Sequence, residues 1–138
     1  MPHWTRETLH QTLAEAFGAD RVATLDDEQT TLQVVLDDAG DLEVTLVASE
    51  HQIYCSTPLV TAGQVRDRAA FNDACMRLNP LNPLSNLGLA TVDDQDVYVV
   101  FGELSADSTA GQIVHEIRTL GVNAIDAIET LQTYLVTA

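Results

Sequence analysis

The sequence predicts an α+β fold, in which helices pack on an antiparallel sheet of about five strands. Residues 108–136 carry apolar side chains at the 3.6-residue period of one long amphipathic helix. Upstream segments alternate apolar and polar residues between turn signals, which is typical of half-buried strands. The elements follow the order α-β-β-β-α-β-β-α, and no linker is long enough to divide residues 1–138. We therefore expect a single domain.

The first helix is predicted over residues 5–17. Thr5 is a suitable N-cap, because its side-chain oxygen can accept a backbone N–H of the first turn. Gly18 is expected to end the helix, and Trp4 is placed to pack back onto it. Residues 21–25 then form either a short strand or a turn.

A three-stranded meander is predicted next. Its first strand covers residues 32–36 and ends at the turn signal of residues 37–41. Residues 42–48 alternate cleanly between apolar and polar side chains. After a turn, residues 52–59 return as the third strand. Short turns between successive strands favour antiparallel pairing.

A second helix is predicted over residues 64–78, and it ends before Pro80 because proline cannot continue a helix. Residues 87–92 and 97–104 then form a hairpin around the acidic loop of residues 93–96.

The last strand is apolar on both faces, which indicates a central strand or a partner on its second side. We expect Phe101 in this strand and Leu120 in the final helix to share one core. Ser105, Asp107 or Ser108 is expected to cap that helix. Gly121 lies inside it and costs about 1 kcal/mol relative to alanine, which indicates a close contact, a kink or a break.

The charge balance limits the possible partners. The chain has 21 acidic residues and 6 basic ones, all of them arginine, and a formal net charge of −15. Binding to nucleic acids or to anionic membranes requires a basic face, so we expect neither. Two interpretations of the acidity stay open: an ordinary acidic protein from a genome rich in arginine codons, and a protein from a host with a saline interior.

We expect a cytoplasmic protein that does not insert into a membrane. Cys55 and Cys75 lie far apart without a CxxC spacing, so buried, reduced thiols are expected rather than a disulfide. The N-terminal residues show no signal peptide, and no window reaches 18 apolar residues.

No motif predicts a catalytic, cofactor or metal site, and none is expected. The histidines show no HExxH or two-histidine-one-carboxylate spacing. The acidic clusters lack the EF-hand pattern and are expected to be solvated turns, with weak cation binding as the alternative. The histidines are His3, His10, His51 and His115. The acidic clusters lie at residues 26–28, 37–41 and 93–96.

Three segments carry a resemblance to a known family. They are Pro83-Leu84-Ser85-Asn86-Leu87-Gly88, Val100-Phe101-Gly102-Glu103-Leu104-Ser105-Ala106, and a helix with Glu116-Ile117, Thr119-Leu120 and Asn123. Together they resemble the YjfI-like family of bacterial proteins, mainly over residues 80–130. The resemblance implies an association with phage-shock-protein-A-like membrane-stress proteins. The element order is also similar to that of type III secretion chaperones and YbjN-like proteins, and such folds hold other polypeptides.

These observations favour a non-enzymatic protein-binding module, either an adaptor or chaperone-like, which is linked to a membrane-stress response and forms a homodimer. The final helix and the last strand have more apolar side chains than one sheet face requires, and a partner surface would use them. The expected partner is a protein, with a phage-shock-protein-A-like protein as the candidate that the resemblance implies. The candidate contact residues are Val114, Val122, Ile125, Tyr134, Tyr98 and Val100.

A second hypothesis stays open, in which the chain is an enzyme or binds a small ligand through a site dispersed in the sequence. That site would combine His51, Glu103, Tyr98 and His115. Converging polar groups in a concave pocket would favour this hypothesis. A flat apolar patch or a helix groove would favour the binding module.

Overall fold

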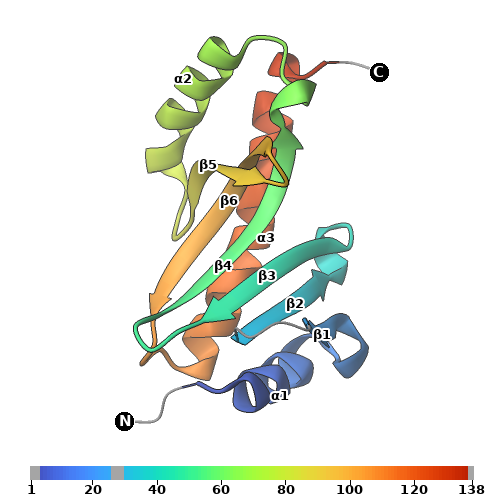
Figure 1. Ribbon diagram of the computed structural model, residues 1–138, viewed down its shortest axis with the longest axis vertical. Coiled ribbons are helices and arrows are strands. Elements are labelled where there is room, and N and C mark those ends of the chain that lie inside the picture. Colours follow the sequence, from blue (N-terminus) through green and yellow to red (C-terminus); the bar gives the residue numbers. More distant parts are fainter. Residues whose placement is uncertain (1–3, 26–29, 137–138) are drawn as a thin grey trace.

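The computed structural model describes residues 4–25 and 30–136, which form three α-helices and one six-stranded antiparallel sheet (Figure 1). The helices are α1 (Arg6–Phe17), α2 (Arg68–Leu78) and α3 (Ala110–Leu131). The strands are β1 (Val22–Thr24), β2 (Thr30–Leu36), β3 (Leu42–Ala48), β4 (Gln52–Thr61), β5 (Asn86–Val92) and β6 (Gln95–Ser105). In space the strands follow the order β1-β2-β3-β4-β6-β5.

The predicted α+β class is confirmed, but the expected sheet of about five strands has six. The additional strand is β1, in the segment that was expected to be a strand or a turn. Its three residues pair antiparallel with β2, so that Val22 lies opposite Val34 and Thr24 opposite Leu32. Val22 is buried in the core, and β1 is therefore a short strand at one edge of the sheet.

Both ends of α1 agree with the prediction. The Thr5 side chain accepts a hydrogen bond from the Thr8 N–H at 3.1 Å, and the Thr8 side chain accepts one from the Thr5 N–H at 2.9 Å. Gly18 ends the helix with a φ of 108°, a backbone conformation that glycine adopts without steric cost. The Trp4 indole donates to the Ser108 carbonyl at 2.9 Å and so ties α1 to the loop before α3.

The predicted start of α2 is wrong by four residues. The helix begins at Arg68 because the Asp67 side chain accepts a hydrogen bond from the Ala70 N–H and caps it. Gln64 belongs to a separate 3₁₀ turn, where its side chain accepts a hydrogen bond from the Thr61 N–H at 2.8 Å. The residues between the two helical segments include Val65, which forms a β-bridge with Leu135.

The hairpin of β5 and β6 is tighter than expected. Asp93 and Asp94 have φ values of 50° and 63°, and Val92 pairs directly with Gln95. Two central residues at positive φ define a type I′ turn, whose twist matches that of the flanking strands. The loop therefore covers two residues rather than the four that were expected.

The N-cap of α3 is Thr109, so the expected cap at Ser105, Asp107 or Ser108 is wrong. Thr109 and Gln112 form a capping box, with hydrogen bonds of 3.1 and 2.8 Å. The helix continues without a break through Gly121, which marks a close contact. A Cβ atom at this position would lie 2.7 Å from Leu36 Cδ1, so glycine lets the β2–β3 hairpin approach the helix.

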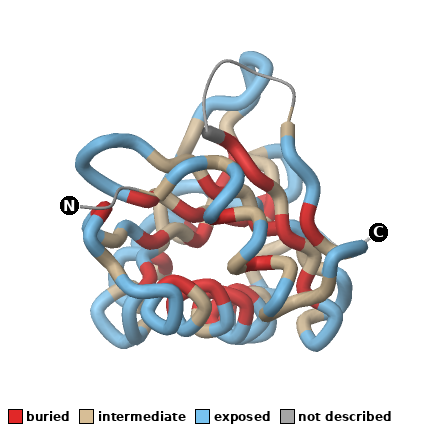
Figure 2. The backbone as a smooth tube through the Cα atoms, turned by 90° about the horizontal axis from the view of Figure 1, so that it is seen from below, coloured by how far each residue is buried: buried red, intermediate tan, exposed pale blue. Residues whose placement is uncertain are grey.

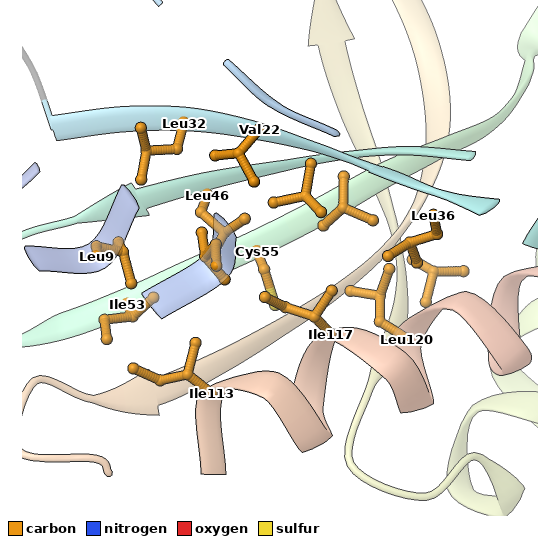
Figure 3. Close-up of a cluster of buried hydrophobic side chains, with 14 of the residues drawn as sticks. Leu9, Val22, Leu32, Leu36, Leu46, Ile53, Cys55, Ile113, Ile117 and Leu120 are labelled. Atoms are coloured by element: carbon orange, nitrogen blue, oxygen red, sulfur yellow. The ribbon is translucent and has the colours of Figure 1, made fainter. Parts of the chain in front are cut away.

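All three helices contribute to the core on one face of the sheet (Figures 1 and 2). Ile113, Ile117 and Leu120 point from α3 toward the strands (Figure 3). A second buried cluster joins α2 to β4, β6 and the end of α3 around Phe71. Leu59 and Leu87 pack against both clusters, so the two are continuous.

The prediction that Phe101 shares a core with Leu120 is wrong. Phe101 is only partly buried and stacks on Tyr54 with a ring centroid distance of 5.8 Å, while Val100 lies in the core with Leu120. Successive side chains of a strand point to opposite faces. Both faces of β6 are apolar, so periodicity alone does not show which of them the helices cover.

The distribution of charge leads to a prediction about salt. In the described part of the chain, Arg21, Arg68 and Arg77 form salt bridges with aspartates at exposed positions. Six arginines cannot neutralise 21 acidic residues, so repulsion between carboxylates opposes folding. We expect the melting temperature to rise between low salt and about 1 M monovalent salt, where the Debye length falls to about 3 Å. A scan by differential scanning calorimetry in which the melting temperature stays flat or falls would contradict this account.

Candidate functional site

A groove lies between α1, α3 and the β2–β3 hairpin. Its cavity volume is about 340 Å³. We call it the α1–α3 groove and define it by Ala16 and Phe17 of α1, residues 35–39 of the hairpin, and Arg118, Val122 and Ile125 of α3.

Two apolar side chains of this groove are open to solvent. Val122 is 59% exposed and Ile125 is 38% exposed, although both lie on the most apolar helix of the chain. They flank the buried stripe that includes Leu120 and Ala124, so the sheet does not cover them. Both are among the partner contacts that the sequence predicts from the surplus of apolar side chains on this helix.

Arg118 covers one end of the groove. Its guanidinium lies 5.3 Å from the centroid of the Phe17 ring and donates a long hydrogen bond of 3.5 Å to the Ala16 carbonyl. A cation over an aromatic face is held by the quadrupole of the ring. At the other side of the groove, Asp37 forms a salt bridge of 2.8 Å with Arg21 rather than with Arg118.

The other predicted contact residues lie outside this groove. Val114 is partly buried and lines a shallower depression that continues between α1 and α3. Tyr134 is partly buried near the end of α3 and packs edge-on against Phe71 at 6.1 Å. The expectation that Tyr98 and Val100 lie at the surface is wrong, since they are 4% and 0% exposed. They lie on the helix-covered face of β6.

The four residues of the alternative site do not come together. His51 is exposed in the turn between β3 and β4, and His115 is exposed on α3. Glu103 lies on the open face of β6, while Tyr98 lies on the opposite face, where its hydroxyl group hydrogen-bonds to the Asn72 side chain. No common pocket in the described residues is lined by these four side chains.

The sequence reasoning missed a buried carboxyl group at Glu116 of α3. Glu116 is only 5% exposed, and its Oε2 atom has no hydrogen-bond partner. A Cβ atom at Gly102 would lie 2.4 Å from Oε2, so the carboxyl group fits only because this residue is glycine. Burial raises the pKa of Glu116, and the neighbouring His115 opposes this effect.

The resemblance segments meet at α3. Gly102 contacts Glu116, and Asn123 donates from its buried side chain to the Pro83 carbonyl at 2.7 Å and to the Ser85 hydroxyl. These contacts bring parts of the three segments together in space. They hold the residues before β5 and the strand β6 against the helix, which is a structural role.

Cys55 and Cys75 are packing residues, as expected. Both are buried and free. Burial raises the pKa of the Cys55 thiol to about 12 and that of Cys75 to about 11. A thiol nucleophile requires a lowered pKa, so burial disfavours a nucleophilic role for these two groups.

Exposed apolar side chains also lie before the edge strand β5 and on both of its faces, and the sequence reasoning did not find them. Five large apolar side chains are exposed on α2, on β5 and between them, and no acidic residue occurs between Asp73 and Asp93. We call this the β5 surface and define it by Met76, Leu81, Leu84, Leu89 and Val92.

No group of three or more His, Cys, Asp or Glu side chains that could hold a metal ion occurs among residues 4–25 and 30–136. His3 and the acidic cluster at 26–28 lie outside these ranges. Over the same part of the chain, no helix has the length and apolar character needed to cross a bilayer.

Comparison with known proteins gives a family match over almost the whole chain. Residues 3–135 match the model of the DUF2170 family, which is described as an uncharacterised protein conserved in bacteria. The protein YjfI of Escherichia coli strain K12, also described as uncharacterised, is 29% identical over 106 residues. The match covers 77% of this chain and 80% of YjfI. The resemblance to the YjfI-like family is thus confirmed.

The fold is shared with solved structures of low sequence identity. A chain of the HopA1–SchA chaperone–effector complex matches with a TM-score of 0.63 at 13% identity, covering 89% of this chain and 92% of that one. A chain of the ExsC–ExsE complex gives 0.60 at 17% identity, with 91% and 95% covered. YbjN of E. coli gives 0.64 at 18% identity, with 96% and 95% covered. The predicted type III secretion chaperone-like or YbjN-like fold is confirmed.

Proposed function

The chain belongs to the DUF2170 family, and from this premise we propose that it is a non-enzymatic protein-binding module. It holds an apolar segment of another polypeptide in the α1–α3 groove. The observation that carries the proposal is the exposure of Val122 and Ile125 in a concave site of about 340 Å³. Covering two such side chains removes apolar area from water, which is favourable by about 25 cal/mol per Å².

The shared fold supports the same class of function. One matching structure is a chaperone–effector complex, and another is a complex of two named proteins. A shared fold is an analogy and does not identify a partner. The groove is the place where such binding would occur on this chain, because it combines a concave shape, exposed aliphatic groups and a polar rim.

The groove also favours a binding module over the alternative enzyme or small-ligand site. Its described polar groups are Arg118, Asp37 and Asp38, and Asp37 is already paired with Arg21. Polar residues expected for the alternative site lie elsewhere. A cytoplasmic location, a link to membrane stress and a phage-shock-protein-A-like partner stay predictions, and that partner is the first one to test.

We expect the double variant Val122→Asp/Ile125→Asp to lose binding of an apolar segment by about 100-fold, because two charges would have to be desolvated in the contact. The probe is a labelled amphipathic peptide of about 18 residues, or five helical turns, with a leucine face and a glutamine face. Fluorescence anisotropy measures the affinity.

The matched control is Thr130→Asp/Thr133→Asp, which adds the same two charges at exposed positions at the end of α3 and beyond it. It should bind like the wild type, and circular dichroism should show that both variants fold. Equal binding by the wild type and the groove variant would refute the assignment of the groove.

We also propose that the protein dimerises through the β5 surface. An edge strand without charged residues presents free backbone groups, and natural proteins usually protect or cover such strands. β5 has seven residues and no charge, while β1 at the other edge has three residues. Leu84 is exposed, and its φ of 68° is a strained backbone conformation for leucine. The Asn123 side chain stabilises this conformation by donating a hydrogen bond to the carbonyl of the preceding residue, Pro83.

The substitutions Leu84→Asp and Leu89→Asp together should convert a dimer into a monomer. A stable contact buries at least about 1,000 Å², and a charge in its centre is costly. Sedimentation velocity over a range of protein concentrations measures the change. A wild type that stays monomeric at the highest concentration would refute the dimer and leave the groove proposal intact, because β5 lies at the far side of the sheet from β2 and β3.

A further inference from the structure

The exposed stripe of α3 continues beyond the α1–α3 groove as an acidic stripe. Asp126 and Glu129 are exposed, and they lie four residues after Val122 and Ile125. Residues four apart on a helix are neighbours on one face. The two apolar side chains of the groove are thus followed directly by two carboxylates on the same helix.

The opposite wall of the groove is also acidic. Asp37 and Asp38 line the groove from the β2–β3 hairpin and are exposed. Asp37 is engaged by Arg21 at 2.8 Å, whereas Asp38 forms no salt bridge within the described chain. The cation of the groove, Arg118, is held over the Phe17 ring at the other end. The groove thus has exposed apolar side chains on α3, two aspartates on its hairpin wall, and two further carboxylates one helical turn beyond it along α3.

We infer that the α1–α3 groove takes a basic amphipathic helix of a partner protein. The inference rests on the proposed function and adds the chemistry of the partner. The apolar face of the partner helix covers Val122 and Ile125, and its lysine or arginine side chains reach Asp38 on the hairpin and Asp126 and Glu129 one turn further along α3. An amphipathic helix that binds in a groove presents apolar anchors three or four residues apart on one face, so a single helix face can supply both the apolar contacts and the flanking basic side chains.

The net charge favours the same sign of partner. A chain with a formal charge of −15 repels acidic segments and attracts basic ones over long distances. Complementary charges around an apolar contact increase the association rate and exclude wrong partners. Asp38, Asp126 and Glu129 place negative charge next to the groove, so they add a local attraction to the general one.

Three labelled peptides test the inference. They share one leucine face, and their polar face consists of lysine, glutamine or glutamate. With the wild type, the lysine peptide should bind about tenfold more tightly than the glutamine peptide, which corresponds to a few exposed ion pairs. The glutamate peptide should bind most weakly. The difference between lysine and glutamine peptides should shrink as salt is added.

Matched charge variants separate local recognition from general attraction. Asp38→Asn/Asp126→Asn/Glu129→Gln removes three charges at the groove. Glu50→Gln/Glu103→Gln/Asp107→Asn removes three charges in the β3–β4 turn, on the open sheet face and before α3, all exposed positions away from the groove. The groove variant should lose the preference for lysine, while the remote variant should keep it.

The outcomes distinguish the two proposals. Equal affinity of the wild type for the lysine and glutamine peptides overturns the basic helix but leaves the groove as a protein-binding site. If both charge variants lose the preference for the lysine peptide equally, the basic-helix inference is also overturned, because the attraction then comes from the net charge of the protein alone. If no peptide binds to the wild type at any salt concentration, the proposed function itself fails.

Discussion

Replacing Phe71 with alanine should lower the free energy of unfolding by about 3–5 kcal/mol, as expected for a fully buried phenylalanine. Phe71 is 1% exposed and fixes α2 to the rest of the chain. Its ring contacts Tyr98 of β6 edge-on, with a centroid distance of 4.6 Å, and Tyr134 at 6.1 Å. Truncation leaves a cavity between α2, β6 and the turn that contains Tyr134, and these elements cannot easily move together to fill it. Urea denaturation followed by circular dichroism measures the loss.

Phe101→Ala is the matched control, because it removes the same side chain from the open face of the sheet. Phe101 is partly exposed and contacts mainly Tyr54 and Gly88. Its truncation should cost about 1 kcal/mol, the scale of an aromatic cross-strand pair. Equal losses for the two variants would mean that the open face is covered in solution, which contradicts the assignment of that face to solvent.

Glu116→Gln should raise the free energy of unfolding at pH 7, because the neutral amide avoids the cost of burying an ionised carboxylate. The carboxyl group is enclosed between α3, Gly102 and Cys55. Burial disfavours its charged form and raises its pKa in the folded state above the ordinary value of 4.5. Glutamine keeps the size of the side chain and cannot ionise.

The sign of the pH dependence follows from this raised pKa. Protons bind more tightly to Glu116 in the folded state, so its contribution to stability is full below the unfolded pKa of 4.5. The contribution is lost as the pH rises through the folded pKa. The wild type should therefore lose stability over this window relative to Glu116→Gln. Glu103→Gln, an exposed control on β6, should follow the wild type. Parallel curves for the wild type and Glu116→Gln would contradict the buried, ionising carboxyl group.

Periodicity predicted the elements whose two faces differ in polarity. The alternation in β3 and the stripe of α3 identified both elements, and the margin of that stripe predicted the exposure of Val122 and Ile125. β6 has apolar residues on both faces, so Phe101 was assigned to the wrong side. Only the positions of the helices determine which face of a strand is covered.

Other features depend on contacts that are remote in sequence. The N-cap of α3 is not one of them, because Thr109 and Gln112 have the S/T-x-x-E/Q spacing of a capping box in the sequence itself. Glu116 is buried although it is charged, because Gly102, which is remote in sequence, leaves space for its carboxyl group in the core. The β5 surface could not be found without knowing that β5 lies at the edge of the sheet. The gap in acidic residues between Asp73 and Asp93 was the one signal available.

The central claim is that the α1–α3 groove is the surface that binds a partner segment. The most direct test is an NMR titration of the isotope-labelled protein with the neutral glutamine-faced peptide. We expect chemical-shift changes at residues 16–17, 35–39 and 118–125, because these residues line the groove or lie between those that do. Changes confined to the β5 surface or to the open face around Tyr54, or a spectrum that does not change at saturating peptide, would contradict the claim.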